Sequence, residues 1–568
     1  QLPLCSRIHV GIIGSNSISD GYDTTVTDIQ FFAARNEDVL AYGPGSPERA
    51  ALQDALREQA SRIQDIPLVI GGRHIPTSQR ADVVAPHRHR QVLARVSQAS
   101  AEQAQQAIDA AIAAREAWAA TPLEERAAVF LRAADLLAGT WRQRLNAATM
   151  LGQGKTAQQA EIDSACELID FLRFNVQFAF EIQAQQPLST DGVNNRTEYR
   201  PLEGFVYAVT PFNFTAIGGN LATAPVLMGN TVVWKPSATA ALSNYLFMLV
   251  LEEAGLPPGV INFLPGEPEA ISATLLGSPH LAGIHFTGST AVFDRLWLQT
   301  AQNLPRYRGY PRLVGETGGK DFVVAHASAE LDALAVGLLR GAYEYQGQKC
   351  SAASRAYVPA SLWPQLKPRL LDLIAQVRMG DVQDFENFMG AVIDRRAFDR
   401  LCGAIATARA DASVQVLTDA DPDDSVGFFI PPTLVQVNDP AHRLMSEELF
   451  GPLLAVYVYE DQDWEKTLAL VDATGPYALT GAVFAKDPLA LAQADKALRN
   501  AAGNFYVNDK PTGAVVGQQP FGGARRSGTN DKAGSALNLL RWTSARTVKT
   551  TAVPAIDFRY PHMATEAA

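Results

Sequence analysis

The sequence predicts an α/β protein with two α/β domains, and three observations lead to this prediction. Between residues 205 and 286, short apolar runs alternate with helical stretches, which favours a mostly parallel sheet covered on both faces. A second series of the same kind extends from residue 322 to 508. A chain of 568 residues is also too long for a single hydrophobic core. We place the domain boundary near Gly318 and Gly319.

Composition and charge exclude several classes of protein. With 47% hydrophobic and 19% charged residues, the chain is typical of a globular protein, and no apolar run reaches the roughly 18 residues that a membrane span needs. The 48 Lys and Arg against 59 Asp and Glu give a net charge of −11 without a basic cluster, so no nucleic acid is expected as a partner. The four cysteines are scattered without metal-ligand spacing, so we expect no metal and a reducing compartment.

Residues 100 to 183 are predicted to form a scaffold of helices. Ser100 and Gln103 have the spacing of a capping box, and a second helix is predicted to begin with Thr121 as its cap and Pro122 as its first residue. Residues 1–30 form an N-terminal extension that shows no targeting signal, and we assign it no function.

The two α/β series contain nine predicted strands. These cover residues 205–209, 231–234, 260–264, 283–286, 322–325, 356–359, 453–459, 482–485 and 505–508. Two further extended segments, residues 195–201 and 546–553, have no place in either domain, and each would be an exposed edge on a monomer.

Cys350 is the candidate nucleophile. It lies in a polar, glycine-containing turn between a predicted helix over residues 331–343 and a predicted strand over residues 354–359. Rigid elements on both sides would hold such a loop thiol in place, where it can meet a ligand. The alternative is an unreactive, half-buried free cysteine.

Three other motifs follow predicted strands, a fourth lies at the end of the first domain, and each has two interpretations. Gly288 and Ser289 lie between a strand and a helix, which suits a phosphate site or a tight turn. Lys235 could contact a ribose or a phosphate, or could be a solvated surface lysine. Glu316 is a carboxylate beside two glycines, which also mark ordinary turns. Asn213 offers an amide donor for an oxyanion, or is a turn residue.

Together these segments resemble the aldehyde dehydrogenase superfamily from about residue 65 to residue 550. Six motifs recur in the order typical of that family, at residues 211–214, 235–237, 286–290, 316–320, 347–351 and 447–452. Residues 212–217, 344–351 and 512–525 are most similar to its Δ1-pyrroline-5-carboxylate dehydrogenase branch. That branch oxidises glutamate γ-semialdehyde to glutamate in proline catabolism.

The resemblance implies an aldehyde dehydrogenase-like fold, with two Rossmann-like α/β domains and a small β oligomerisation arm. The implied NAD-binding domain covers residues 31–185 and 206–317, the catalytic domain residues 318–525, and the arm and tail residues 186–205 and 526–568. In such a fold the arm pairs with a strand of a neighbouring subunit, so a homodimer or higher homo-oligomer is expected. The implied compartment is the cytoplasm, or the mitochondrial matrix in a eukaryote.

The resemblance also implies a mechanism. Cys350 attacks the aldehyde as a thiolate, the Asn213 amide and the Cys350 backbone N–H hold the oxyanion, and Glu316 activates the water that hydrolyses the thioester. The implied cofactor is NAD, with contacts from Lys235, Ser237, Gly288, Ser289, Glu448 and Phe450. Many NAD-preferring relatives carry Glu three residues after the lysine, where this chain has Ala238, so some NADP activity is also expected.

The implied substrate site serves an amino-acid semialdehyde. Ser351 and the backbone N–H groups of Gly513 and Ala514 match the family's carboxylate anchor, while Phe214 and Phe521 would line the aliphatic part. Both phenylalanines could instead be packed in a core. The alternatives are an enzyme for another small semialdehyde and a catalytically inactive structural or binding member of the fold, although Cys350, Glu316 and Asn213 are all present.

Overall fold

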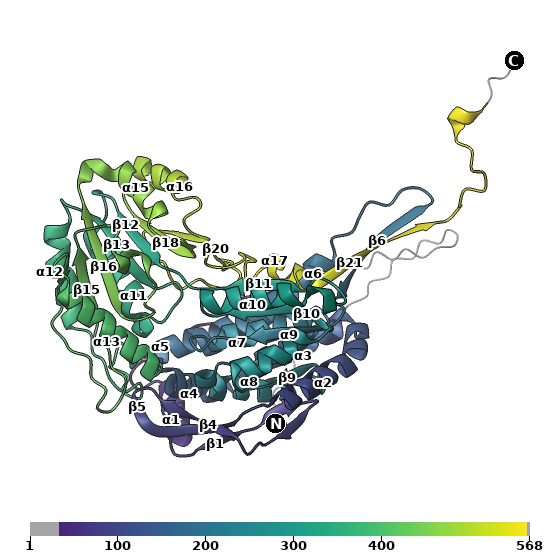
Figure 1. Ribbon diagram of the computed structural model, residues 1–568, viewed down its shortest axis with the longest axis horizontal. Coiled ribbons are helices and arrows are strands. Elements are labelled where there is room, and N and C mark those ends of the chain that lie inside the picture. The colour runs from purple at the N-terminus through teal and green to yellow at the C-terminus, as the bar shows by residue number, and fades with distance from the viewer. Residues whose placement is uncertain (1–32, 565–568) are drawn as a thin grey trace.

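The structure is a computed structural model that describes residues 33–564, so the expectations about residues 1–30 lie outside the described residues. Two seven-stranded sheets, each covered by its own helices, form the two halves of the molecule in Figure 1. The predicted α/β class with two α/β units is therefore confirmed. The chain passes from one sheet to the other between Glu316 and Asp321, next to the predicted boundary.

The first sheet has the strand order β11-β10-β7-β8-β9-β2-β3, and the five strands from β11 to β9 are parallel. Its strands are β2 (Leu68–Ile70), β3 (Arg73–Ile75), β7 (Phe205–Val209), β8 (Thr231–Lys235), β9 (Ile261–Phe263), β10 (Leu281–Thr287) and β11 (Arg312–Glu316). All four strands predicted for this half are present.

Helices cover both faces of the first sheet. Side chains alternate along a strand, so the neighbours Val233 and Trp234 on β8 are buried on opposite faces. Val233 packs in a cluster with α2 (Ala101–Ala120), α9 (Pro268–Gly277) and α10 (Thr290–Asn303). Trp234 packs in a cluster with α3 (Leu123–Ala138), α6 (Leu168–Gln183), α7 (Thr215–Leu227) and α8 (Ala241–Glu253).

The second sheet has the order β14-β15-β16-β13-β12-β18-β19, in which only β14 is antiparallel to its neighbour. Its strands are β12 (Asp321–Ala325), β13 (Ala353–Pro359), β14 (Val414–Val416), β15 (Thr433–Val437), β16 (Leu453–Tyr459), β18 (Thr480–Phe484) and β19 (Asn504–Val507). The helices of this half are α11 (Leu331–Tyr343), α12 (Trp363–Ala375), α13 (Arg395–Ala410), α14 (Arg443–Ser446), α15 (Trp464–Ala473) and α16 (Pro488–Ala497). The five predicted strands are present, whereas β14 and β15 were not predicted.

The helical scaffold departs from the prediction at one cap. The capping box of α2 is confirmed, because the Ser100 hydroxyl accepts from the Gln103 N–H and the Gln103 amide oxygen accepts from the Ser100 N–H. Thr121 does not cap α3. Its N–H and hydroxyl both donate to the Ala117 carbonyl, so Thr121 ends α2, and Pro122 precedes α3.

The scaffold continues through α4 (Arg142–Gln153) and α5 (Ala157–Ala160) into a π-helix, η1 (Glu161–Glu167), which leads directly into α6. Gly154 ends α4 with a φ of 71°, a left-handed conformation that glycine adopts readily. No element was predicted before residue 100, where the structure has β2 and β3 and also α1 (Pro47–Ala60), β1 (Gln64–Ile66), β4 (Arg80–Ala85) and β5 (Arg88–Ser97).

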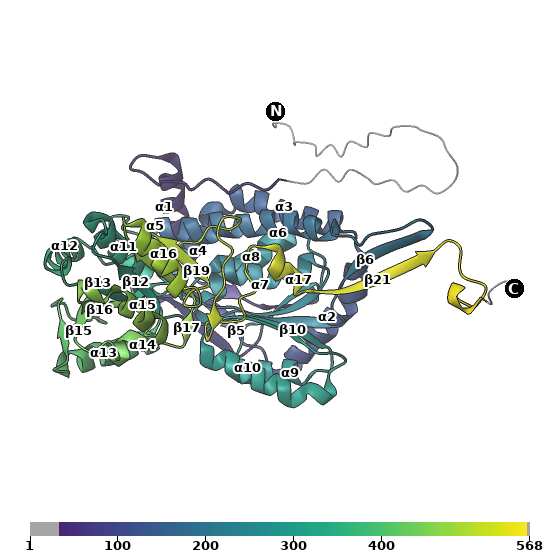
Figure 2. The ribbon, with the colours of Figure 1, turned by 90° about the horizontal axis from the view of Figure 1, so that it is seen from above.

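The two extended segments without a place in either sheet pair with each other. β6 (Val193–Pro201) and β21 (Thr543–Thr551) form an antiparallel two-stranded arm that projects from the body in Figures 1 and 2. The expectation of two separate exposed edges is corrected here, because the backbone groups along one edge of each strand pair with the other strand. The rest of the tail differs from the expected arm, since residues 526–542 lie against the body and Trp542 is buried there. Within residues 33–564, no helix is long and apolar enough to cross a membrane.

Candidate active site

The carboxyl ends of four parallel strands bring the predicted motifs of the first half together. Asn213 follows β7, Lys235 ends β8, Gly288 follows β10 and Glu316 ends β11. Because these strands are parallel neighbours, the segments that follow them meet at one edge of the sheet, where ligands bind in open α/β folds. The Gly288 N–H donates to the Glu316 carbonyl at 3.2 Å, which joins two of these segments directly.

The nucleophile turn is held in an uncommon backbone conformation. The three residues from Tyr345 to Gly347 have φ values of 53°, 54° and 64°, and a positive φ is rare in residues other than glycine. The buried amide of Gln346 holds the turn through three hydrogen bonds of 2.8–3.0 Å, to the backbone of Gly154, Gly390 and Ala391. The turn therefore delivers Cys350 to the start of β13 from a fixed position, as the prediction of a loop held at both ends requires.

Cys350 and Glu316 face each other across the two halves. The Cys350 Sγ lies 3.5 Å from Glu316 Oε1 and donates to it. Burial raises the pKa of Glu316 to about 7, and the pKa of the Cys350 thiol lies well above its usual value because of burial and the nearby Glu316 charge. A carboxylate with a pKa near neutrality can act as a general base toward water at physiological pH.

Asn213 lies at the junction of the two halves. Its side chain is buried, and Nδ2 donates to the Gln348 carbonyl at 3.1 Å, two residues before Cys350. The amide therefore reaches the nucleophile turn, and its position there suits the donor role more closely than that of an ordinary turn residue. An amide N–H beside the nucleophile can stabilise negative charge on a substrate oxygen.

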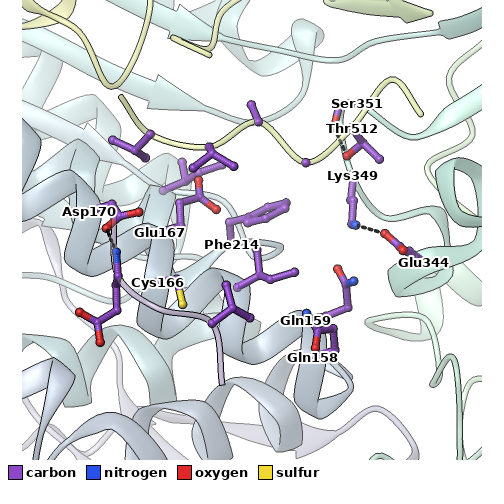
Figure 3. Close-up of a pocket in the computed structure, with 18 of the residues that line it drawn as sticks. Gln158, Gln159, Cys166, Glu167, Asp170, Phe214, Glu344, Lys349, Ser351 and Thr512 are labelled. Atoms are coloured by element: carbon purple, nitrogen blue, oxygen red, sulfur yellow. Dashed lines mark hydrogen bonds and ion pairs between the residues drawn. The ribbon is translucent and has the colours of Figure 1, made fainter. Parts of the chain in front are cut away.

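A cavity of about 880 Å³ opens beside the thiol. Two of the three catalytic candidates, Glu316 and Cys350, line it, whereas Asn213 does not. All five predicted substrate residues line it: Phe214, Ser351, Gly513, Ala514 and Phe521. The Ser351 and Thr512 hydroxyls are 2.8 Å apart at its wall, and Lys349 donates to Glu344 at 3.1 Å there (Figure 3). The two phenylalanines therefore line a cavity and are not confined to a core.

Lys235 is buried. The interpretation of Lys235 as a solvated surface lysine is therefore wrong. Its residue is 7% exposed, and burial lowers its pKa to about 8. Nζ donates to the carbonyl of Pro236 at 3.3 Å, and no other acceptor among residues 33–564 binds it. A buried ammonium with spare donors at the end of a strand suits a ligand hydroxyl. Ser237 lies two residues further on, half-buried.

The other cofactor candidates flank the path between the sheets. Ser289 caps α10, so free N–H groups of that helix are available to a phosphate. The Glu448 carboxylate accepts from the Gly319 N–H at 2.9 Å, and burial raises its pKa to about 7. Phe450, with a φ of 53°, meets the Phe212 ring edge-on at 5.8 Å between centroids. These residues lie outside the lining of the 880 Å³ cavity, consistent with a separate cofactor side.

Sequence reasoning missed two parts of the site. An extended segment over residues 36–42 forms one wall of the cavity, where the Asn36 amide and the Glu37 N–H donate to Asp170 at 2.8 and 2.7 Å. Lys155 and Asp163 form a fully buried ion pair behind Phe214. The acidic residues of η1 interrupt an otherwise apolar helical stretch, and that interruption was the available signal.

Comparison with known proteins agrees with this geometry. The sequence profile of the aldehyde dehydrogenase family matches residues 74–548. The mitochondrial Delta-1-pyrroline-5-carboxylate dehydrogenases of Bos taurus and Homo sapiens are 53% and 52% identical to this chain over 529 residues, which is 93% of this chain and 94% of each relative.

Solved structures agree as well. The Mycobacterium tuberculosis Delta-pyrroline-5-carboxylate dehydrogenase bound with NAD is 57% identical, with a TM-score of 0.91 over 94% of this chain and 99% of that chain. The 1-pyrroline-5-carboxylate dehydrogenase from Thermus with bound NAD is 31% identical, with a TM-score of 0.86 over 92% of this chain and all of the other. The chain therefore belongs to the aldehyde dehydrogenase family, and it has that family's fold.

Proposed function

We propose that this protein oxidises L-glutamate γ-semialdehyde, formed from Δ1-pyrroline-5-carboxylate, to L-glutamate with NAD as the cofactor. The observation that carries the proposal is the 3.5 Å contact between the Cys350 thiol and the Glu316 carboxylate at the wall of the 880 Å³ cavity. The relatives named as Delta-1-pyrroline-5-carboxylate dehydrogenases support the choice of substrate, because their identity extends over nearly the whole chain.

The chain supplies a nucleophile, an oxyanion site and a base. Cys350 reacts as the thiolate after its proton passes to solvent, and its sulfur forms a bond to the aldehyde carbon, while the carbonyl π electrons move onto the oxygen. We expect the Asn213 amide and the Cys350 N–H to hold that oxygen. NAD, when bound, accepts the hydride from the same carbon, which leaves a thioester on Cys350.

Glu316 serves the second half of the reaction. We expect it to take a proton from water, so that the hydroxyl adds to the thioester carbon. The C–S bond then breaks, its electron pair returns to sulfur, and the carboxylate product leaves. One nucleophile and one base therefore suffice for both steps.

The residues around the cofactor side fit a dinucleotide. We expect Lys235 and Ser237 to contact the adenosine ribose, Gly288 and Ser289 the pyrophosphate, and Glu448 and Phe450 the nicotinamide ribose. The buried Lys235 ammonium has donors to spare, and the start of α10 presents N–H groups. The donor set therefore matches hydroxyl groups on one side and a phosphate on the other.

The cavity suits a substrate with an amino-acid end. We expect the Ser351 hydroxyl, with the N–H groups of Gly513 and Ala514, to anchor the α-carboxylate. Phe214 and Phe521 would contact the methylene groups between that end and the aldehyde. Gly513 has a φ of 95°, which allows its backbone to face a ligand in a conformation that other residues rarely adopt.

We also propose that the protein assembles as a homodimer or higher homo-oligomer through the β6–β21 arm. Pairing satisfies one edge of each strand. The other edge of β6 is partly occupied by Gln186 and Ser189, whose side chains bond the backbone of Thr197 and Asn195, so the outer edge of β21 is the one we expect a neighbouring subunit to pair with. A reducing compartment, the cytoplasm or the mitochondrial matrix, suits the free thiols of Cys166, Cys350 and Cys402.

The test is NAD reduction with Δ1-pyrroline-5-carboxylate beside succinate semialdehyde and propanal. We expect the highest kcat/KM with pyrroline-5-carboxylate, and competitive inhibition by glutamate. A preference for succinate semialdehyde without glutamate inhibition would favour another small-semialdehyde dehydrogenase. The absence of turnover with all three substrates would favour an inactive member of the fold.

A further inference from the structure

A fully buried ion pair lies behind the catalytic groups. Lys155 Nζ is 2.7 Å from Asp163 Oδ2, and the two side chains are 1% and 0% exposed. Lys155 follows the left-handed Gly154 at the end of α4, whereas Asp163 lies in the π-helix η1. Neither residue lines the 880 Å³ cavity, so neither is placed to touch a substrate there. A buried ion pair is seldom kept for stability alone, because desolvation offsets most of its attraction.

Asp163 holds the segment that carries Asn213. Its Oδ2 accepts from the Thr215 N–H at 2.9 Å and its Oδ1 accepts from the Ala216 N–H at 2.8 Å. These are the first two residues of α7, whose own N-cap, Phe214, provides no side-chain bond. Asp163 therefore caps α7 from a distant element and sets the position of the residues just before it.

Lys155 joins this segment to the nucleophile turn. Its Nζ lies 3.9 Å from the centroid of the Phe214 ring and 4.6 Å from that of the Tyr345 ring. An ammonium over an aromatic face is attracted to it, and the attraction is greatest where water is excluded. Phe214 is next to Asn213, and Tyr345 belongs to the left-handed turn that delivers Cys350. One cation therefore contacts both sides of the oxyanion site.

We propose that Lys155 and Asp163 are positioning residues that set the distance between the Asn213 amide and the Cys350 thiol. The inference rests on the proposed function, in which both groups act on the aldehyde. The pair fixes the Asn213 side through the two N–H groups of α7 and the Cys350 side through the Tyr345 ring. Without the Lys155–Asp163 pair, the amide and the thiol are both still present. They are no longer held where the thiol can attack the aldehyde carbon while the amide contacts the oxyanion.

The test variant is Lys155→Met, which removes the cation and keeps an apolar chain of similar length between the rings. The matched control is Arg126→Met. Arg126 is also a buried cation, and it binds the opposite end of the same helix, where Nε donates to the Leu227 carbonyl at 3.0 Å. Both variants lose a buried cation near one end of α7, but only Lys155→Met loses it at the end next to Asn213.

The measurements are the pre-steady-state rate of NADH formation, the Kd for NAD and the melting temperature. We expect Lys155→Met to slow NADH formation at least tenfold, with the Kd for NAD within twofold of wild type. Arg126→Met should lower the melting temperature and leave the rate within twofold. In an Asn213→Ala background, Lys155→Met should lower the rate of NADH formation by less than a further twofold. The amide that Lys155 positions is already absent from that background.

The result that would overturn the proposal is a folded Lys155→Met enzyme with a rate within twofold of wild type. An equal loss in Arg126→Met, or a full tenfold further loss in the Asn213→Ala background, would also overturn it. The double variant Lys155→Met/Asp163→Asn leaves no unpaired buried charge and is judged by the same rates if Lys155→Met does not fold. Failure of the wild type itself to form NADH from pyrroline-5-carboxylate would instead count against the proposed substrate.

Discussion

Glu316 ends the last strand of the first sheet, and Cys350 precedes a strand of the second, yet the carboxylate and the thiol lie 3.5 Å apart. The thiol donates a hydrogen bond to the carboxylate, and both groups line the same cavity. The candidate active site therefore lies at the junction between the two sheets. The base is buried enough for its pKa to rise to about 7, so it can change protonation state during a reaction at neutral pH.

Replacing the nucleophile should abolish dehydrogenase turnover and leave NAD binding intact. We expect Cys350→Ala to lower kcat by more than about 1000-fold, or about 4 kcal/mol, because the sulfur that forms the thioester is removed. Steady-state assays and NAD titration measure the two effects. The control is Cys402→Ala, on α13 and outside the cavity lining, which should behave like wild type. Turnover by Cys350→Ala within tenfold of wild type would remove Cys350 from this role.

Replacing the base should separate oxidation from hydrolysis. We expect Glu316→Gln to give a rapid burst of NADH followed by turnover about 100-fold slower than wild type, because the amide cannot take a proton from water. Stopped-flow absorbance records the burst, and mass spectrometry detects the acyl-enzyme. The exposed Glu460→Gln serves as a control. A missing burst would show that Glu316 acts before hydride transfer.

The rate of thioester hydrolysis should rise with pH through about 7. Burial raises the pKa of Glu316 to about 7, and only the ionised carboxylate can act as a base, so activity is lost as the pH falls through that value. At pH 6 about one tenth of Glu316 is ionised, so hydrolysis should be about tenfold slower than at its plateau. Single-turnover decay of the acyl-enzyme measures this rate. A flat profile from pH 5.5 to 8.5 would contradict the base role.

The exposed Ala238 should permit some use of NADP. We expect Ala238→Glu to lower kcat/KM for NADP at least tenfold, about 1.4 kcal/mol, and to change that for NAD by less than about threefold, because a carboxylate there would repel a 2′-phosphate. Ala238→Gln is the matched control, since it has the same size and no charge. Equal NADP activity in both variants would show that position 238 does not face the 2′ position.

Removing the arm strand should lower the oligomer order. We expect deletion of residues 544–568 to do so in analytical ultracentrifugation, because it removes β21 and leaves β6 unpaired. A truncation after residue 552 retains β21 and serves as the control. It also removes the exposed Ile556, Phe558 and Tyr560, so it separates the arm from the apolar tail. A full-length protein that sediments as a monomer at micromolar concentration would refute assembly through the arm.

The sequence by itself determined nine of the fourteen strands in the two large sheets and the order of the motifs. The strands β7 and β16 have the predicted bounds, and helix α11 begins and ends where the pattern placed it. Cys350, Lys235 and Gly288 were each placed correctly beside a strand end, whereas β11, which ends at Glu316, was not predicted. These features follow from neighbouring residues, because hydrophobic period and turn chemistry are local properties of the chain.

The tertiary structure alone decided which of these groups meet. Glu316 and Cys350 are 34 positions apart, and Ser351 and Thr512 are 161 apart, yet each pair is in contact. Three other contacts also depend on tertiary packing. The Thr121 hydroxyl bonds to α2, β6 pairs with β21 in the same chain, and Lys155 forms a buried ion pair with Asp163. A side chain's direction and burial depend on which distant elements pack against it. Those elements cannot be identified from the neighbouring residues in the sequence. The residues that react can therefore be read from motifs, but the distances that let them react come from the fold.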